Sequence, residues 1–142
     1  MSRDIHNLDL GYNSFMKTKF QERYEMLNNE QKKAVDAIDG PVMVVAGPGT
    51  GKTQILTLRI ANIIDKTDTE PENILALTFT ESGVHAMRKR LVEMVGPLAY
   101  RVGIYTFHSF SNDIIQNNPE EFPRIIGARA ITDVDQIAII ED

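Results

Sequence analysis

The stretch that decides the fold of this chain is Val42-Met43-Val44-Val45 followed directly by Ala46-Gly47-Pro48-Gly49-Thr50-Gly51-Lys52-Thr53. The four apolar residues at 42–45 are typical of a buried β-strand. After the loop, apolar residues recur at helical spacing, at Ile55, Leu56, Ile60, Ile63 and Ile64. A strand, a glycine-rich turn, the pair Lys-Thr and a helix form the context in which this pattern binds phosphate.

The glycines of segment 46–53 explain why it predicts a phosphate-binding loop. Glycine adopts backbone conformations that are closed to other residues, so several N–H groups can point into one concavity. The following helix adds the positive end of its dipole. We expect Lys52 to reach the β- and γ-phosphates of a nucleotide and the Thr53 hydroxyl to ligate Mg²⁺. The alternative is a glycine-rich turn that binds nothing, which the Gly-Lys-Thr sequence at this offset disfavours.

Composition and charge narrow the class of protein. The chain has 142 residues, 42% hydrophobic and 25% charged, which suits one globular domain with a core. It has no cysteine, no signal-like N-terminus and no apolar run of membrane-spanning length, so we expect a cytoplasmic protein without a membrane partner. The net charge of −5 weighs against a broad electrostatic footprint on duplex DNA. Single-stranded DNA stays open as a partner, because stacking on aromatic side chains carries much of that affinity.

Strands and helices are expected to alternate along the chain. Apolar runs predict strands at 42–46, 74–78 and 102–106 and a short one at 129–131. Periodicity and turn signals predict helices over 14–26, 28–38, 52–65, 81–95, 107–116 and from 132 onward. Such alternation predicts an α/β fold, with a parallel sheet, right-handed crossovers and helices on both faces. The run Arg88-Lys89-Arg90 is expected to lie on a solvated helix face.

Gln31, just upstream of the loop, has two interpretations. Its amide offers a donor and an acceptor together, which suits the edge of an adenine. Asn28 three residues earlier also makes it the second half of a helix capping box, and the spacing alone favours the cap.

Two strand ends carry further candidates, because open α/β sheets bind ligands at the carboxyl ends of their strands. Phe79 follows the strand at 74–78 and could stack on a base, although a phenylalanine beside a buried strand is more often part of the core. Thr80 is also a candidate helix cap. After the strand at 102–106, the side chains of Thr106, His108 and Ser109 could hydrogen-bond phosphate or sugar. The three histidines lack the spacing of metal ligands.

Together and in this order, the four segments resemble the start of a UvrD/Rep-like superfamily 1A DNA helicase, from Leu27 to the end of the chain. Leu-Asn-x-x-Gln at 27–31 is similar to the family's Q motif, and 46–53 matches motif I, Ala46 included. The segment 78–80 resembles motif Ia, and 106–108 resembles motif Ib. The family usually continues motif Ia with Asn-Lys-Ala-Ala, whereas this chain has Glu-Ser-Gly-Val at 81–84, which puts the polar DNA contacts of those positions in doubt.

The resemblance implies a RecA-like P-loop NTPase domain that uses ATP and Mg²⁺ and, in the parent protein, single-stranded DNA as partner. It places Lys52 and Thr53 in catalytic roles, with Thr53 as the metal ligand. The implied nucleotide-binding residues are Gln31, Ala46, Gly47, Pro48, Gly49, Thr50, Gly51, Lys52, Thr53 and Gln54. The implied DNA-binding residues are Thr78, Phe79, Thr80, Thr106, His108 and Ser109.

The family's Walker B motif, an Asp-Glu pair after a strand, does not occur in this sequence, where Glu141-Asp142 has the reverse order. Because the resemblance begins at Leu27, we expect residues 1–26 to be an N-terminal extension with an amphipathic helix. Residues 27–142 are expected to be the first part of helicase domain 1A, truncated before Walker B, with the remaining helicase domains missing. The parent would be an ATP-dependent DNA helicase of DNA repair, and this fragment would bind nucleotide without efficient hydrolysis. The alternative is a non-catalytic P-loop nucleotide-binding module.

Overall fold

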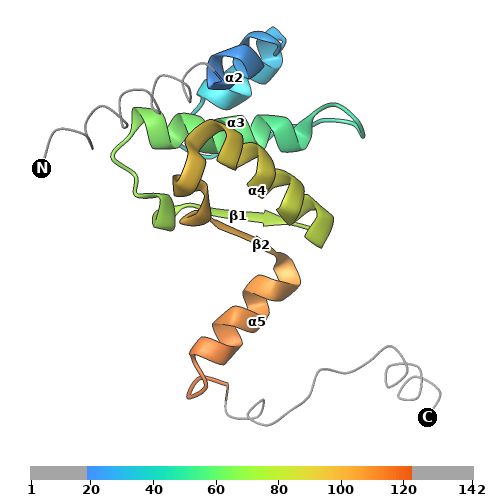
Figure 1. Cartoon of the computed structure of the whole chain (residues 1–142). Coiled ribbons are helices and arrows are strands. Elements are labelled where there is room, and N and C mark those ends of the chain that lie inside the picture. The colour runs from blue at the N-terminus through green and yellow to red at the C-terminus, as the bar shows by residue number, and fades with distance from the viewer. Residues whose placement is uncertain (1–18, 123–142) are drawn as a thin grey trace, which may run out of the picture. The chain divides into compact units, whose positions relative to one another are not determined.

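The computed structural model describes residues 19–122. Residues 19–25 are helical, and they are followed by α2 (Asn29–Asp36), α3 (Lys52–Lys66), the 3₁₀ turn η1 (Pro71–Asn73), β1 (Leu75–Thr78), α4 (Glu81–Val95), the 3₁₀ turn η2 (Gly96–Tyr100), β2 (Gly103–Thr106) and α5 (Phe107–Asn117) (Figure 1). The chain divides into two compact units, 1–107 and 108–142. All elements before α5 belong to the first unit. The predicted strand at 129–131 and the helix from 132 lie outside the described residues.

The sheet of the described part consists of β1 and β2, which pair in parallel. Leu75 lies opposite Gly103, and Thr78 lies opposite Thr106 at the carboxyl ends. Parallel strands need a crossover connection, and α4 provides it, packing on both strands and on α3 (Figure 1). This arrangement confirms the α/β class and the two predicted strands at 74–78 and 102–106.

The core of the first unit lies between α3, α4 and the strands. Leu58 of α3 and Leu91 of α4 are completely buried, and burying a leucine side chain contributes about 1.5–3 kcal/mol. Around them lie Val35, Ile55, Ala61, Met87, Val102 and Ile104. The helix predicted over 81–95 is confirmed, and one of its faces packs on the core: Met87, Leu91 and Val95 are buried, and Val84 packs against the same cluster.

The predicted strand at 42–46 is wrong for the described structure, where these residues form no strand. Met43 and Val45 are each 88% exposed, whereas Val42 and Val44 are about half covered. A strand is stabilised by backbone hydrogen bonds to a neighbour, and within residues 19–122 the two strands pair with each other and leave 42–46 without such a partner. Its apolar sequence therefore lies largely on the surface.

The corner between α4 and β2 is held by a basic side chain. Gly96, with φ of 53°, ends α4 as the Gly-Pro sequence predicts. The guanidinium of Arg88 donates from Nη1 to the carbonyl of Ala99 and, at 2.7 Å, to the carbonyl of Val102. The prediction of a solvated face at 88–90 is thus wrong for Arg88, because the chain turns back after α4 and presents these carbonyls to it.

Candidate functional site

The predicted phosphate-binding loop at 46–53, called the phosphate loop below, takes its shape from two glycines. Gly49 and Gly51 have φ of 74° and 83°, a region that costs other residues roughly 1–2 kcal/mol. Gly51 is the residue before α3, and its carbonyl accepts the N–H of Ile55 at 3.0 Å, the first bond of the helix. The glycines at positions 49 and 51 therefore turn the chain directly into the helix, as the sequence predicts.

The cation of the loop points back into it. Lys52 Nζ donates to the carbonyl oxygens of Ala46 at 3.2 Å and Gly47 at 2.6 Å. The hydroxyl of Thr50 donates to the same Gly47 oxygen at 2.7 Å, which closes the loop around the ammonium group. The first turn of α3 carries no acidic residue and no side-chain cap. The positive end of the helix dipole is therefore not neutralised by a side chain of α3 itself. These features fit an anionic phosphate.

Thr53 and Gln54 occupy the first turn of α3, beside Lys52. Both are half-buried. Gln54 lines a hollow of about 510 Å³ together with residues of the helix at 19–25 and Glu93 of α4. A single hydroxyl next to the loop suits Mg²⁺, which keeps several waters and takes its other ligands from phosphate.

Gln31 takes the capping role, and its side chain also reaches the phosphate loop. Its Oε1 accepts the N–H of Asn28 at 3.0 Å, and the Asn28 side chain accepts the N–H of Gln31 at 2.9 Å, which completes the capping box of α2. Its Nε2 also donates to the carbonyl of Thr50 at 3.2 Å. The predicted cap is confirmed, and the same amide connects α2 to the phosphate loop.

The carboxyl ends of β1 and β2 form the second part of the candidate site. Thr78 and Thr106 pair across the sheet, and a phenylalanine follows each of them. Phe79 is 82% exposed, which rules out the core interpretation. Phe107 is 54% exposed and was not among the predicted site residues, although the repeated Thr-Phe sequence could have indicated it.

The threonines of this edge mainly stabilise the protein itself. Thr80 accepts the N–H of Gly83 at 3.1 Å and is the predicted cap of α4. Thr106 is only 5% exposed, and its hydroxyl donates to Glu81 Oε1 at 3.2 Å. Glu81, at the start of α4, is a carboxylate contact that the sequence did not predict. His108 is exposed and Ser109 half-buried on α5, whose residues from 108 onward belong to the second unit.

The described residues hold neither a metal-binding cluster nor a helix that could span a membrane. Within 19–122, no three acidic, histidine or cysteine side chains are grouped so that they could hold a metal ion. None of the helices described there has the length and apolar character needed to cross a membrane.

Similarity to known proteins identifies the family of the chain. The family model of the UvrD/REP helicase N-terminal domain matches residues 27–141. The ATP-dependent DNA helicase PcrA of Staphylococcus aureus is 36% identical over 116 residues, which are 82% of this chain and 16% of that protein. DNA helicase II of Rickettsia typhi is 40% identical over 131 residues, 89% of this chain and 20% of that protein. The chain thus spans about a fifth or less of the length of these relatives, and it belongs to the UvrD/REP helicase N-terminal domain family.

Proposed function

We propose that this chain is the ATP-binding part of an ATP-dependent DNA helicase or translocase that moves on single-stranded DNA. The observation that carries the proposal is the phosphate loop, in which the ammonium of Lys52 lies against the carbonyls of Ala46 and Gly47 at the start of α3. Family membership and the names of its relatives, which are ATP-dependent DNA helicases, support the same reading. The parent protein would be a cytoplasmic enzyme of DNA repair.

The nucleotide would occupy the loop through its phosphates. Lys52 would exchange its two carbonyl partners for β- and γ-phosphate oxygens, which are stronger acceptors because they are charged. Backbone N–H groups around Gly49 and Gly51 would hold the remaining oxygens. Mg²⁺, when bound, neutralises charge on the phosphates, and the Thr53 hydroxyl would be its protein ligand here.

Single-stranded DNA would cross the edge at the ends of β1 and β2. Phe79 presents most of its ring to solvent there, and every base has a face that can stack on it. Thr78 and Thr80 flank Phe79 in the sequence. Contacts of Thr106, His108 and Ser109 to the DNA backbone stay a separate prediction from the sequence. The net charge of −5 fits a site in which stacking outweighs bulk attraction.

Hydrolysis needs groups that this sequence does not contain. An acidic pair must hold Mg²⁺ and orient the attacking water, and no Asp-Glu sequence occurs among the 142 residues. Arginine fingers, which contribute about 10³-fold or more to the rate, would come from other helicase domains. We therefore propose that the chain alone binds nucleotide and hydrolyses it negligibly.

A phosphate-release assay tests the proposal for the 142-residue chain and for the longer protein. The 142-residue chain is expected to show no turnover above background, with or without oligo(dT). The longer protein that contains it is expected to hydrolyse ATP, with a large stimulation by oligo(dT) and none by an equal concentration of an anionic control polymer such as polyglutamate. DNA-stimulated turnover by the chain alone would contradict the proposal that it binds nucleotide without hydrolysing it. A longer protein whose ATP hydrolysis did not respond to DNA would contradict the helicase proposal.

A further inference from the structure

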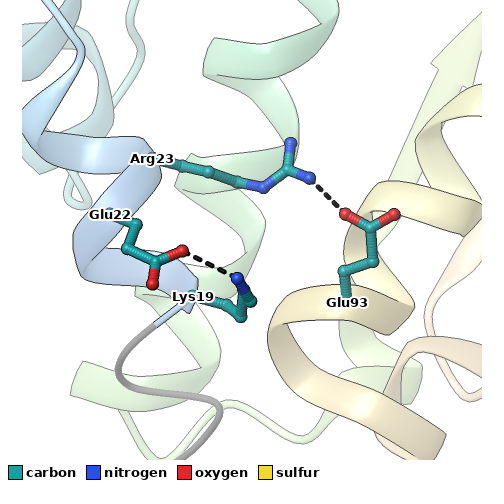
Figure 2. A network of polar contacts seen from close by, with 4 residues as sticks. All are labelled: Lys19, Glu22, Arg23 and Glu93. Carbon is teal, nitrogen blue, oxygen red and sulfur yellow. Dashed lines mark hydrogen bonds and ion pairs between the residues drawn. The ribbon is translucent and has the colours of Figure 1, made fainter.

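The helix at residues 19–25 is bound to two elements of the first unit. Phe20 stacks on Tyr24 with ring centroids 5.7 Å apart, and both rings pack against the buried core cluster. Arg23 forms an ion pair with Glu93 of α4, while Lys19 and Glu22 pair at 2.8 Å along the same helix (Figure 2). Since α4 itself packs on α3 and on both strands, this helix is held to the body of the unit.

Tyr24 is the residue of this helix that contacts α2. Its hydroxyl donates to Asp36 Oδ2 at 2.5 Å, at the last residue of α2. The ammonium of Lys32 lies 5.5 Å from the centroid of its ring. The bond to the Asp36 carboxylate raises the pKa of Tyr24 above its ordinary value of 10.0, at which the hydroxyl is already protonated at neutral pH. Tyr24 thus contacts α2 at its end and near its middle.

The contacts of Tyr24 with α2 matter because α2 in turn contacts the phosphate loop. Gln31 lies one residue before Lys32, and its amide donates to the carbonyl of Thr50. The Gln31 amide also borders Gly51, since a side-chain carbon placed on Gly51 would lie in ordinary van der Waals contact with Gln31 Nε2, at 3.8 Å. A shift or rotation of α2 would therefore break the contact between Gln31 and the loop. The path from Tyr24 to the loop consists of one helix and two hydrogen bonds.

We propose that Tyr24 is a positioning residue for nucleotide binding, which anchors α2 so that Gln31 holds Thr50 and keeps the phosphate loop in its binding shape. The inference rests on the proposed function, since it assumes that the loop binds Mg-ATP. It assigns a role to the segment that precedes residue 27, where the match to the family model begins. Tyr24 touches no nucleotide in this scheme and acts only through Gln31.

The experiment is a double-mutant cycle on the whole 142-residue chain, with Mg-ATP affinity measured by titration calorimetry. The Tyr24→Phe variant removes one hydroxyl and leaves the ring beside Lys32 and Phe20, so the fold is expected to persist. Its affinity is expected to fall about threefold, the effect of losing one weak intramolecular hydrogen bond. In the Gln31→Ala background the same change is expected to have no further effect, because Tyr24 acts through Gln31. Tyr100→Phe, at a tyrosine that is 71% exposed, is the control for removal of a tyrosine hydroxyl and should bind like the wild type.

Thermal melts of all variants separate this role from simple stabilisation. A purely structural Tyr24 would lower the melting temperature and leave the affinity of the folded protein unchanged, and that result would overturn the proposal. Equal losses from Tyr24→Phe in the presence and absence of Gln31 would also overturn it, since the two residues would then act independently. If the wild type failed to bind Mg-ATP, or if Lys52→Ala bound it equally well, the proposed function would fall first and the positioning role with it.

Discussion

At the scale of single residues, several side chains of the candidate site can be assigned a structural task from their contacts. Lys52 turns into the loop, Gln31 bridges the loop to α2, and Thr80 caps α4. Phe79 differs from them, because it is a large apolar side chain that remains 82% exposed. Exposure of one large apolar residue is common, but its place at the ligand edge of a parallel sheet connects it with binding.

Phe79→Ala is expected to weaken single-stranded DNA binding by the longer protein about tenfold or more, because stacking of a base on an aromatic ring is worth roughly 1–3 kcal/mol. ATP affinity and melting temperature should stay unchanged, since little of the ring is buried. Fluorescence anisotropy with a labelled oligo(dT) measures the affinity. Tyr100→Ala removes another largely exposed ring and serves as the control. Unchanged DNA binding in Phe79→Ala would remove the strongest residue-level support for the DNA edge.

At the scale of elements, local sequence signals succeeded where the partners of an element lie near in the chain. The strands β1 and β2 and the helix α4 between them follow their apolar patterns. Each strand has the other strand as its hydrogen-bonding neighbour and α4 as the helix that packs on it. The segment 42–46 has an equally apolar pattern but lacks a neighbouring strand within residues 19–122, so its pattern alone could not form one. Tertiary contacts such as those of Arg88 and Glu81 have no local signal, because the groups they bind are set by how the chain turns back.

Arg88→Met is expected to lower the free energy of unfolding by about 1–3 kcal/mol. The carbonyls of Ala99 and Val102 would lose their donor in a part-buried corner, and an unsatisfied acceptor carries a desolvation cost of that size. Urea unfolding followed by circular dichroism gives the value. The neighbouring exposed Lys89→Met is the matched control and should change stability by less than about 0.5 kcal/mol. An equal effect of the two substitutions would show that the corner does not depend on Arg88.

A pH-dependent contact joins η1 to the turn before β2. Arg101 binds Glu72 and Glu70, and its hydrogen bond lowers the pKa of Glu72 below the ordinary value of 4.5. A carboxyl with a lowered pKa adds stability above its unfolded pKa and loses it as pH falls through the folded value. The melting temperature of the wild type should therefore be slightly higher than that of Glu72→Gln at neutral pH. The difference between the two melting temperatures should shrink as pH falls below 4.5. A difference that grew with acidity would contradict this sign. Because both partners are exposed, the effect will be small and weaker in high salt.

At the scale of the whole molecule, the described part holds a phosphate loop and a strand edge in one unit, and α5 lies largely in a second. The chain corresponds to a fifth or less of its relatives, so hydrolysis and strand separation are proposed for the longer protein and nucleotide binding for the chain itself. The family could be predicted from the sequence because its motifs are short and local. The contact of Glu81 with Thr106 could not, because it depends on how α4 packs beside the end of β2.

The most direct measurement is titration calorimetry of the 142-residue chain with Mg-ATP, in the wild type and in Lys52→Ala. Lys52 supplies the ammonium of the loop, so its loss is expected to abolish most of a modest wild-type affinity without a change in melting temperature, as its side chain is exposed. Lys66→Ala removes an exposed lysine from the opposite end of α3 and should bind like the wild type. Equal affinity of Lys52→Ala and the wild type would contradict the assignment of the loop as the nucleotide site.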